Sequence, residues 1–226
     1  MTQFKTRWDI LPLAQKRLWP QFRAPAAMGL VLYGGTAVAL RLGHRQSIDF
    51  DFFTDNLLDK PAVAEAFPFL ATAQVLQETA QSWTLLAADN MPGERPVQVS
   101  FFGRITNGRV GVPEFTDDGS VLAASPADLL AFKVKVILQR VEAKDYQDIA
   151  VMLAAGGSLA QALSAARTLF GAAFQPMESL KALTCFDGGD LHTLSPTVRD
   201  TLMAAARKPM RLELIPLASE KLTLEI

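Results

Sequence analysis

The spacing of apolar residues divides the chain into two parts of different character. Up to about residue 124, short apolar runs bounded by glycine, proline or polar turns predict strands mixed with a few short helices. The expected strands are 28–33, 48–53, 73–79, 83–88 and 97–102, and the expected helices are 10–22, 37–42 and 61–70. We expect Thr36 to cap the helix 37–42 and Gly43 to end it.

From Ser125 onward the apolar residues recur at helical spacing instead. Ser125 followed by Pro126 and Asp128 is a strong helix start. The expected helices are 125–140, 143–155, 159–170, 177–183 and 197–207, with an extended tail over 212–226. The pattern therefore predicts an α+β protein, with a mixed β-sheet and flanking helices over 1–124 and an α-helical part over 125–226.

Composition and charge narrow the classes of function. Half of the 226 residues are hydrophobic and a fifth are charged, as in ordinary globular proteins. The single cysteine excludes an internal disulfide framework and a cysteine-rich zinc site. With a net charge of −1, the chain lacks the excess of basic residues that holds many proteins to nucleic acid by electrostatic attraction alone. The charge is unevenly distributed, because a basic amino-terminal segment precedes an acidic middle. Without a signal-peptide pattern or an apolar run long enough to span a bilayer, we expect a cytoplasmic protein with no membrane contact.

The segment 48–53 carries two carboxylates at strand spacing. Side chains on a strand alternate between two faces, so Asp49 and Asp51 share one face while Phe50 and Phe52 take the other. Carboxylate oxygens are the hard ligands that Mg²⁺ prefers, particularly where substrate phosphates complete the coordination. The strand therefore predicts a magnesium site.

A glycine pair precedes this strand, at the start of the short helix. Gly34 and Gly35 supply backbone that can approach a phosphate closely, and the exposed N–H groups of a helix start favour an anion. Either signal alone is weak. A strand, a glycine turn, a short helix and a carboxylate-bearing strand in succession are typical of the phosphate- and metal-binding half of a nucleotidyltransferase.

These residues resemble the signature of the AbiEii-type nucleotidyltransferases, a family of the DNA polymerase β superfamily that includes the toxin components of type IV toxin–antitoxin pairs. The family pattern is a Gly-Gly-Thr/Ser turn, a short helix ending in Gly-His-Arg, and then Ser-x-Asp-x-Asp-x-Phe. The matching residues are Gly34, Gly35, Thr36, Gly43, His44, Arg45, Ser47, Asp49, Asp51 and Phe53. A second block, from Lys133 through Arg140 to Lys144-Asp145-Tyr146-Gln147-Asp148, resembles the family's helical lysine and Lys-Asp-x-x-Asp motifs.

The resemblance implies transfer of a nucleoside monophosphate from an NTP to an acceptor hydroxyl, with RNA, and the tRNA acceptor end in particular, as a candidate acceptor. It also implies an antitoxin protein as a candidate partner and Mg²⁺ as the cofactor, held by Asp49 and Asp51. The residues implied in binding the nucleotide and its phosphates are Gly34, Gly35, Thr36, His44, Arg45 and Ser47. Lys133 would contact the triphosphate in a cleft completed by the helical part, and Asp145 or Asp148 would support the metal site or orient that lysine.

The second block also has a purely structural interpretation. On a helical wheel, Lys133 and Arg140 fall on the apolar, inward-facing arc, and Asp128 lies opposite. Asp145 lies on the apolar side of the next helix, with Asp148 at its edge. Charges on a core-facing arc are costly unless they are paired, so these residues either neutralise one another between the helices or face a cleft.

One departure from the superfamily pattern bears on activity. These enzymes usually carry a third carboxylate on a neighbouring strand, and the expected strand 97–102 presents Gln98 and Ser100 on its polar face, with Ser100 where we expect the acid. A catalytically degenerate nucleotide- or partner-binding protein is therefore an alternative. A small-molecule nucleotidyltransferase of the antibiotic-modifying type is another, favoured by the lack of net basic charge.

Overall fold

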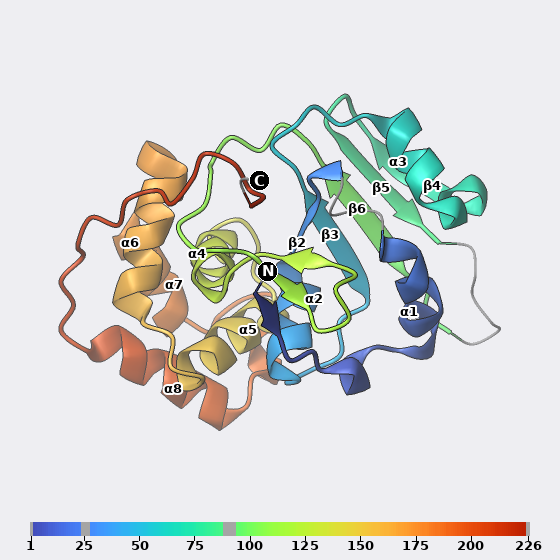
Figure 1. Cartoon of the computed structure of the whole chain (residues 1–226). Helices are drawn as coiled ribbons and strands as arrows, with labels where there is room; N and C mark the ends of the chain where they lie inside the picture. The colour runs from blue at the N-terminus through green and yellow to red at the C-terminus, as the bar shows by residue number, and fades with distance from the viewer. Residues whose placement is uncertain (1, 24–27, 88–93, 225–226) are drawn as a thin grey trace. The chain divides into compact units, whose positions relative to one another are not determined.

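The computed structural model describes residues 2–23, 28–87 and 94–224, and the chain divides into two compact units (Figure 1). The first unit contains Met1–Gly108, Val112–Ala124 and Glu220–Ile226, and the second contains Arg109–Gly111 and Ser125–Ser219. The last residues of the chain, which the sequence groups with the helical part, thus belong to the first unit. None of the helices in the described ranges has the length and apolar character needed to cross a membrane.

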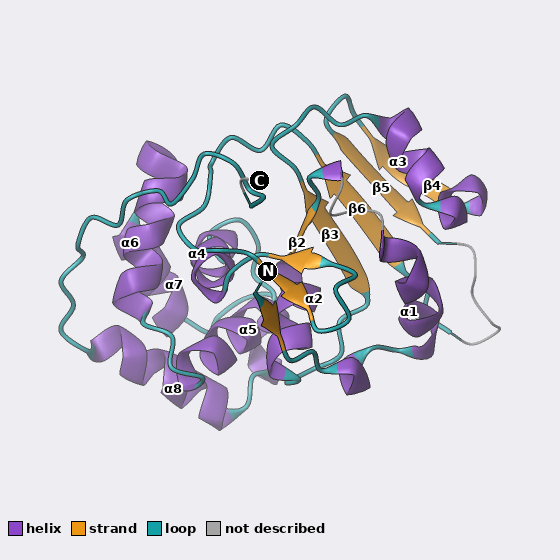
Figure 2. Cartoon of the chain, in the orientation of Figure 1, coloured by secondary structure: helices purple, strands orange, loops and turns teal. Residues whose placement is uncertain are grey.

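The first unit is built on a mixed sheet of eight strands among the described residues, in the order β1-β7-β8-β2-β3-β6-β5-β4 (Figure 2). The strands are β1 (Gln3–Phe4), β2 (Val31–Tyr33), β3 (Asp49–Phe53), β4 (Gln74–Glu78), β5 (Ser82–Leu86), β6 (Gln98–Phe102), β7 (Glu114–Thr116) and β8 (Leu122–Ala123). In the middle of the sheet, β3 runs antiparallel to β2 and parallel to β6, and β5 runs antiparallel to β6. The mixed α/β class predicted from the sequence is confirmed.

The first unit's helices are α1 (Leu13–Leu18), α2 (Gly34–Leu42) and α3 (Lys60–Ala66), with 3₁₀ turns at Trp8–Ile10, Trp19–Arg23 and Pro68–Thr72. The expected helix 61–70 is interrupted because Pro68 has no N–H and disfavours helical backbone at Phe67.

The expected N-cap of α2 is wrong. The helix begins at Gly34 rather than after Thr36, which lies inside the first turn and donates its hydroxyl to the Asp49 carbonyl instead. Gly43 ends the helix with a φ of +66°, as expected.

Aromatic side chains form the core on one face of the sheet. Phe50 and Phe52 of β3 are fully buried, and their ring centroids lie 4.6 and 5.3 Å from that of Phe22. Phe67 packs against Phe22 at 5.8 Å and against Phe101 of β6 at 5.3 Å. These rings meet in the edge-to-face and tilted geometries that aromatic pairs favour. The apolar face of β3 is therefore fixed by a cluster that joins the amino-terminal segment to the central strands.

Two aspartates in the turn between β7 and β8 hold the amino-terminal segment in place. Asp117 accepts hydrogen bonds from the Thr6 backbone N–H and the Trp8 indole, at 3.2 and 3.1 Å. Asp118 accepts one from the Trp19 indole at 2.8 Å. Burial raises the pKa of Asp118, but the hydrogen bonds that it accepts outweigh this and hold its pKa below the ordinary value.

The second unit is helical in the residues that the structure describes. Its helices are α4 (Pro126–Val136), α5 (Ala143–Ala154), α6 (Leu159–Phe170), α7 (Pro176–Thr184) and α8 (Pro196–Arg207). Helix α4 packs against α5 and α6, and α8 packs against α5 and α7. The Ser125 hydroxyl caps α4 by accepting from the Asp128 N–H. Helix α4 ends at Val136, earlier than the sequence predicts.

Phe22 is the ring through which the amino-terminal segment reaches the core, so we expect Phe22→Ala to lower the free energy of unfolding by about 3 to 5 kcal/mol. Urea unfolding followed by fluorescence measures the change. The matched control is Leu13→Ala in the neighbouring helix α1, where the side chain is exposed and the expected change is below about 0.5 kcal/mol. Equal losses from the two variants would contradict the importance of this cluster.

Candidate active site

Strand β3 carries Asp49 and Asp51 on the sheet face opposite to its buried phenylalanines. Both aspartates are half-buried, whereas Phe50 and Phe52 between and after them are fully buried. In the parallel pairing with β6, Asp49 lies opposite Gln98 and Asp51 lies opposite Ser100. The backbone of β3 therefore presents two carboxylates together, beside a strand that offers an amide and a hydroxyl.

The glycine turn at the start of α2 lies directly against these acids. Gly34 adopts a φ of +73°, which L side chains rarely adopt, and a Cβ at this position would overlap the Asp51 carboxylate. A Cβ on Gly35 would overlap the Arg45 guanidinium and lie 3.3 Å from the Ser47 hydroxyl oxygen. Gly34 is favoured by its left-handed backbone, which an L side chain would strain, and Gly35 lets the Arg45 guanidinium approach the helix start closely.

The remaining residues of the signature lie in the same part of the first unit. The Thr36 hydroxyl donates to the Asp49 carbonyl, which ties α2 to β3. Arg45 donates to the Gln46 carbonyl at 3.0 Å, and His44 is half-buried in the same loop. The structure therefore brings Gly34, Gly35, Thr36, Arg45 and Ser47 together with the two aspartates.

The arrangement can receive an anion. Helix α2 has nine residues, and its N-cap residue Tyr33 makes no side-chain capping hydrogen bond. The N–H groups at a helix N-terminus favour an anion's oxygens. The Arg45 guanidinium beside Gly35 adds a full positive charge at this end of the helix.

The arrangement also fits a divalent cation held by two protein carboxylates. Asp49 and Asp51 supply hard oxygen ligands on one face, and Mg²⁺ is commonly bound by one or two carboxylates together with substrate phosphates and water. A third acid is missing at the expected position: Ser100 is 2% exposed and accepts a hydrogen bond from the Thr84 hydroxyl at 3.3 Å. Among the described residues, no group of three or more His, Cys, Asp or Glu side chains could hold a metal ion.

Thr84 is a neighbour of this site that the sequence analysis did not single out. It lies opposite Ser100 in the antiparallel pairing of β5 with β6. The alternation of polar Ser82 and Thr84 in β5 is a signal that could have revealed it.

A second cluster, within the helical unit, contains Lys133, Asp145 and Asp148. The Lys133 ammonium lies 2.7 Å from Asp145 Oδ1 and 2.6 Å from Asp148 Oδ2, and both carboxylates are fully buried. Arg140 Nε donates to Asp145 Oδ2 at 2.8 Å. Two cations and two carboxylates thus neutralise one another between α4 and α5. The contacts bear out ion pairing between the helices, and they do not test whether the cluster also faces a cleft.

Arg140 and Asp128 do not lie where the helical wheel placed them. The Arg140 side chain is 47% exposed, because α4 ends at Val136 and the wheel does not extend to Arg140. Asp128, expected on the solvent side, is 1% exposed and accepts the N–H groups of Val110 and Gly111 at 2.7 and 3.1 Å. Burial raises the pKa of the Asp128 carboxyl, and the hydrogen bonds that it accepts offset this only in part.

The carboxylate strand and the lysine cluster belong to different units. Lys133 is 4% exposed in the chain as a whole. Its expected reach to Asp49 and Asp51 stays a prediction.

A family model described as the nucleotidyl transferase AbiEii toxin of type IV toxin–antitoxin systems matches residues 17–221. The chain belongs to this AbiEii family. The matched region includes the glycine turn, the carboxylate strand and the lysine cluster. A curated relative, an uncharacterized protein of Aquifex aeolicus (strain VF5), is 30% identical over 120 residues; the alignment spans 52% of this chain and 54% of that protein.

Solved structures place the AbiEii-family chain among nucleotidyltransferase folds. A candidate nucleotidyltransferase of H. pylori aligns with a TM-score of 0.57 at 16% identity, over 89% of this chain and 94% of that one. The nucleotidyltransferase toxin MenT4 of Mycobacterium tuberculosis H37Rv aligns with a TM-score of 0.53 at 15% identity, over 84% and 82%. The antibiotic-resistance factor ANT(2'')-Ia aligns with a TM-score of 0.50 at 14% identity, over 67% and 89%. At these identities the likeness shows the fold alone.

Asp145 makes the lysine cluster sensitive to acid. Burial raises its pKa, but the hydrogen bond from Arg140 and the charge of Lys133 outweigh burial and hold its pKa below the ordinary value of 3.8. Its ionised form therefore stabilises the fold above pH 3.8, and this stabilisation is lost as the pH falls through the lower folded value. We expect Asp145→Asn to cost about 3 to 5 kcal/mol at pH 7, since it leaves buried Lys133 with one carboxylate.

Melting temperatures of the wild type and of Asp145→Asn, measured between pH 7 and pH 3, test this expectation. The difference should be large at neutral pH and should shrink below pH 3.8. The control is Glu178→Gln, which removes an exposed partner of Lys181 outside the cluster and is expected to cost less than about 1 kcal/mol. A difference that persists unchanged at pH 3 would show that Asp145 acts through packing and not through its charge.

Proposed function

We propose that this AbiEii-family protein transfers a nucleoside monophosphate from an NTP to an acceptor hydroxyl. The acceptor oxygen bonds to the α-phosphorus, the bond from that phosphorus to the oxygen bridging to the β-phosphate breaks, pyrophosphate leaves, and the hydroxyl proton is released. The observation that carries the proposal is the packing of the glycine turn against the carboxylate strand, with Gly34 at Asp51 and Gly35 at Arg45. Phosphate-binding and metal-binding groups are thereby adjacent in one unit.

In this proposal, Asp49 and Asp51 hold Mg²⁺. When bound, the cation would neutralise charge on the phosphates and on the leaving pyrophosphate. The N–H groups of the first turn of α2 bind phosphate oxygens, and Arg45 clamps the same group from the side of Gly35. Ser47 and His44 add hydrogen-bonding groups in the loop that follows α2.

The proposal assigns Lys133 to the triphosphate. Asp145 and Asp148 use two of its three ammonium donors, and no third partner is found among the described residues. One donor is therefore available to a phosphate oxygen. The two aspartates hold the ammonium in a fixed position, so that binding a phosphate costs little side-chain entropy.

The family also suggests an acceptor and a biological partner for this proposal. We propose RNA, with the tRNA acceptor end as the first candidate, as the acceptor, a cognate antitoxin protein as a partner, and the cytoplasm as the location. The family's description as the toxin of a type IV toxin–antitoxin system supports the antitoxin partner. A second candidate is a nucleotide-binding protein without transfer activity, favoured by the position of buried Ser100 opposite Asp51.

Substitution of the two strand carboxylates tests the proposal. We expect Asp49→Asn and Asp51→Asn to remain folded, because both side chains are half-buried and the change relieves repulsion between neighbouring carboxylates. Each should abolish the rise in melting temperature that Mg²⁺ and NTP together give the wild type. Each should also lower transfer of labelled NMP to total tRNA by at least about 100-fold.

The matched control is Glu65→Gln, an exposed carboxylate in the same unit, which should keep both signals. Transfer to a panel of aminoglycosides, and not to RNA, would favour the small-molecule alternative. Nucleotide-dependent stabilisation without any transfer would favour the binding protein. Full activity of the two Asn variants would overturn the assignment of the metal site.

Restoring an acid at Ser100 tests the neighbourhood of the site. Ser100→Asp introduces a buried carboxylate opposite Asp51, and we expect it to lower the metal-free melting temperature because two close carboxylates repel each other. Added Mg²⁺ should recover the loss and bind more tightly than in the wild type. Ser100→Asn, with the same size and no charge, should show no recovery. If Mg²⁺ fails to stabilise the Asp variant, Ser100 does not border a metal site.

A further inference from the structure

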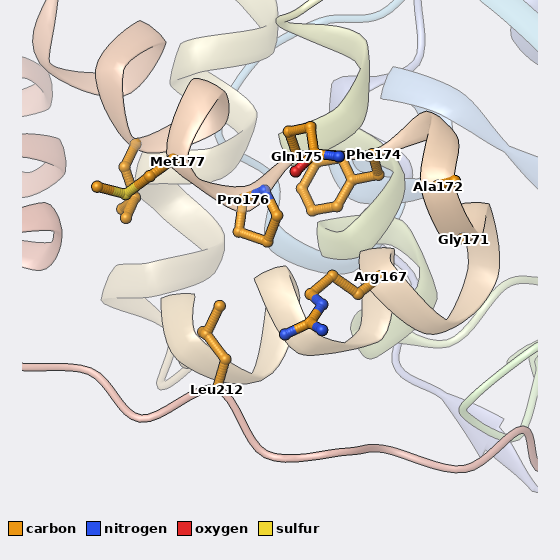
Figure 3. A pocket seen from close by; sticks show the side chains of 9 residues that line it. Arg167, Gly171, Ala172, Phe174, Gln175, Pro176, Met177 and Leu212 are labelled. Carbon is orange, nitrogen blue, oxygen red and sulfur yellow. The ribbon is translucent and has the colours of Figure 1, made fainter.

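The helical unit contains two adjoining cavities that the proposed reaction does not use. The larger, of about 570 Å³, lies between α6, the start of α7 and the carboxyl-terminal tail (Figure 3). The smaller, of about 250 Å³, continues along the tail, and the two share Arg167 and Leu212. Together they form a groove, which we call the tail groove, with a total volume in the range of ordinary ligand-binding sites.

The walls of the tail groove combine apolar side chains with one cation. Phe174, Pro176, Met177 and Leu212 line the larger cavity (Figure 3). Arg167, on the last turns of α6, is exposed at the point where the two cavities meet, and none of the described residues forms an ion pair with its guanidinium. A ligand with apolar groups and one negative charge complements these walls.

The tail supplies a row of main-chain hydrogen-bonding groups beside the groove. Within the described part of the chain, residues 209–214 make no backbone hydrogen bond, and they belong to no helix or strand. Leu214 is 91% exposed, so the tail itself does not fill the groove with this side chain. An exposed extended segment with open N–H and C=O groups can pair with another extended chain.

We propose that the tail groove binds an extended acidic peptide of a partner protein. The peptide would pair with the backbone of residues 210–214, insert apolar side chains at Phe174 and Met177, and place a carboxylate on Arg167. The unpaired main chain of the tail favours a peptide over a small carboxylate, which would leave those N–H and C=O groups unused. Glu213 lines the smaller cavity, whereas Phe174 and Met177 line the larger one, so the peptide's acid and its inserted apolar side chains belong at the larger cavity.

A synthetic peptide tests the proposal on the full chain. The probe is fluorescein-labelled Asp-Thr-Leu-Thr-Leu-amide, in which alternation puts the acid and both leucines on one face. Fluorescence anisotropy should show saturable binding, and Arg167→Gln should weaken it by about tenfold, the loss of one charge-assisted hydrogen bond. Because Arg167 is exposed, the variant should keep the wild-type melting temperature.

The matched control is Lys181→Gln, an exposed cation on α7 that pairs with Glu178 and does not line the groove; binding should be unchanged. The same peptide with Lys in place of Asp should not bind. Two N-methylated peptides, one modified at both threonines and the other at both leucines, test the main-chain pairing. Because alternate N–H groups of a strand face opposite edges, one of these two peptides should lose binding.

Three results would overturn the proposal. Equal binding to Arg167→Gln and wild type would remove the role of the cation. Displacement of the peptide by hexanoate at the peptide's own concentration would assign the groove to small carboxylates. Concentration-dependent dimerisation in analytical ultracentrifugation, lost in Arg167→Gln, would assign it to a second copy of the chain.

Discussion

The five residues of strand β3 place aromatic side chains in the core on one face of the sheet and carboxylates on the other. The candidate site depends on this alternation. Phe50 and Phe52 are buried in the aromatic cluster around Phe22, while Asp49 and Asp51 are held on the other face by the same alternation. A slip of one residue in the pairing with β2 or β6 would bury both carboxylates and expose both rings. The core therefore fixes the sheet face on which the two acids lie.

In the helical unit, the charged side chains of the second motif pair with one another. Lys133 and Arg140 meet Asp145 and Asp148, so two cations and two carboxylates cancel. A buried cluster of this kind is weak evidence for added stability, because hydrophobic side chains of similar volume would be as stable or more so. The desolvation cost of burying these charges is explained if the ammonium group of Lys133 has a function, and the proposed function gives it the binding of the triphosphate.

The sequence predicts most of the fold and of the candidate site because their signals are local. The helices of the second unit follow from apolar periodicity, and the two aspartates of β3 follow from strand alternation. The strands Gln3–Phe4, Glu114–Thr116 and Leu122–Ala123 were missed because two or three residues are too few to show alternation. Their pairing depends on contacts distant in the chain, such as those of Asp117 with Thr6 and Trp8.

Buried charges were the other limit of the sequence analysis. The wheel placed Asp128 in solvent, although Ser125 three residues before it is the signature of a helix start whose side chains turn back to the backbone. In the structure, Asp128 holds the N–H groups of Val110 and Gly111, and nothing in the sequence near Asp128 indicates that segment. The approach of Asp51 to Gly34 is likewise visible only in three dimensions, since the sequence justifies the glycine by its backbone alone.

The charge balance of the candidate site follows from these placements. Two carboxylates beside one guanidinium give the candidate site a small net negative charge, and Ser100, opposite Asp51, adds a hydroxyl but no charge. We infer that such a site has low affinity for a free divalent cation, since Mg²⁺ gives up its water reluctantly and here finds few anionic ligands. Nucleotide phosphates supply the missing oxygens. Binding of Mg²⁺ at Asp49 and Asp51 would then depend on prior binding of the nucleotide phosphates at the first turn of α2 and Arg45.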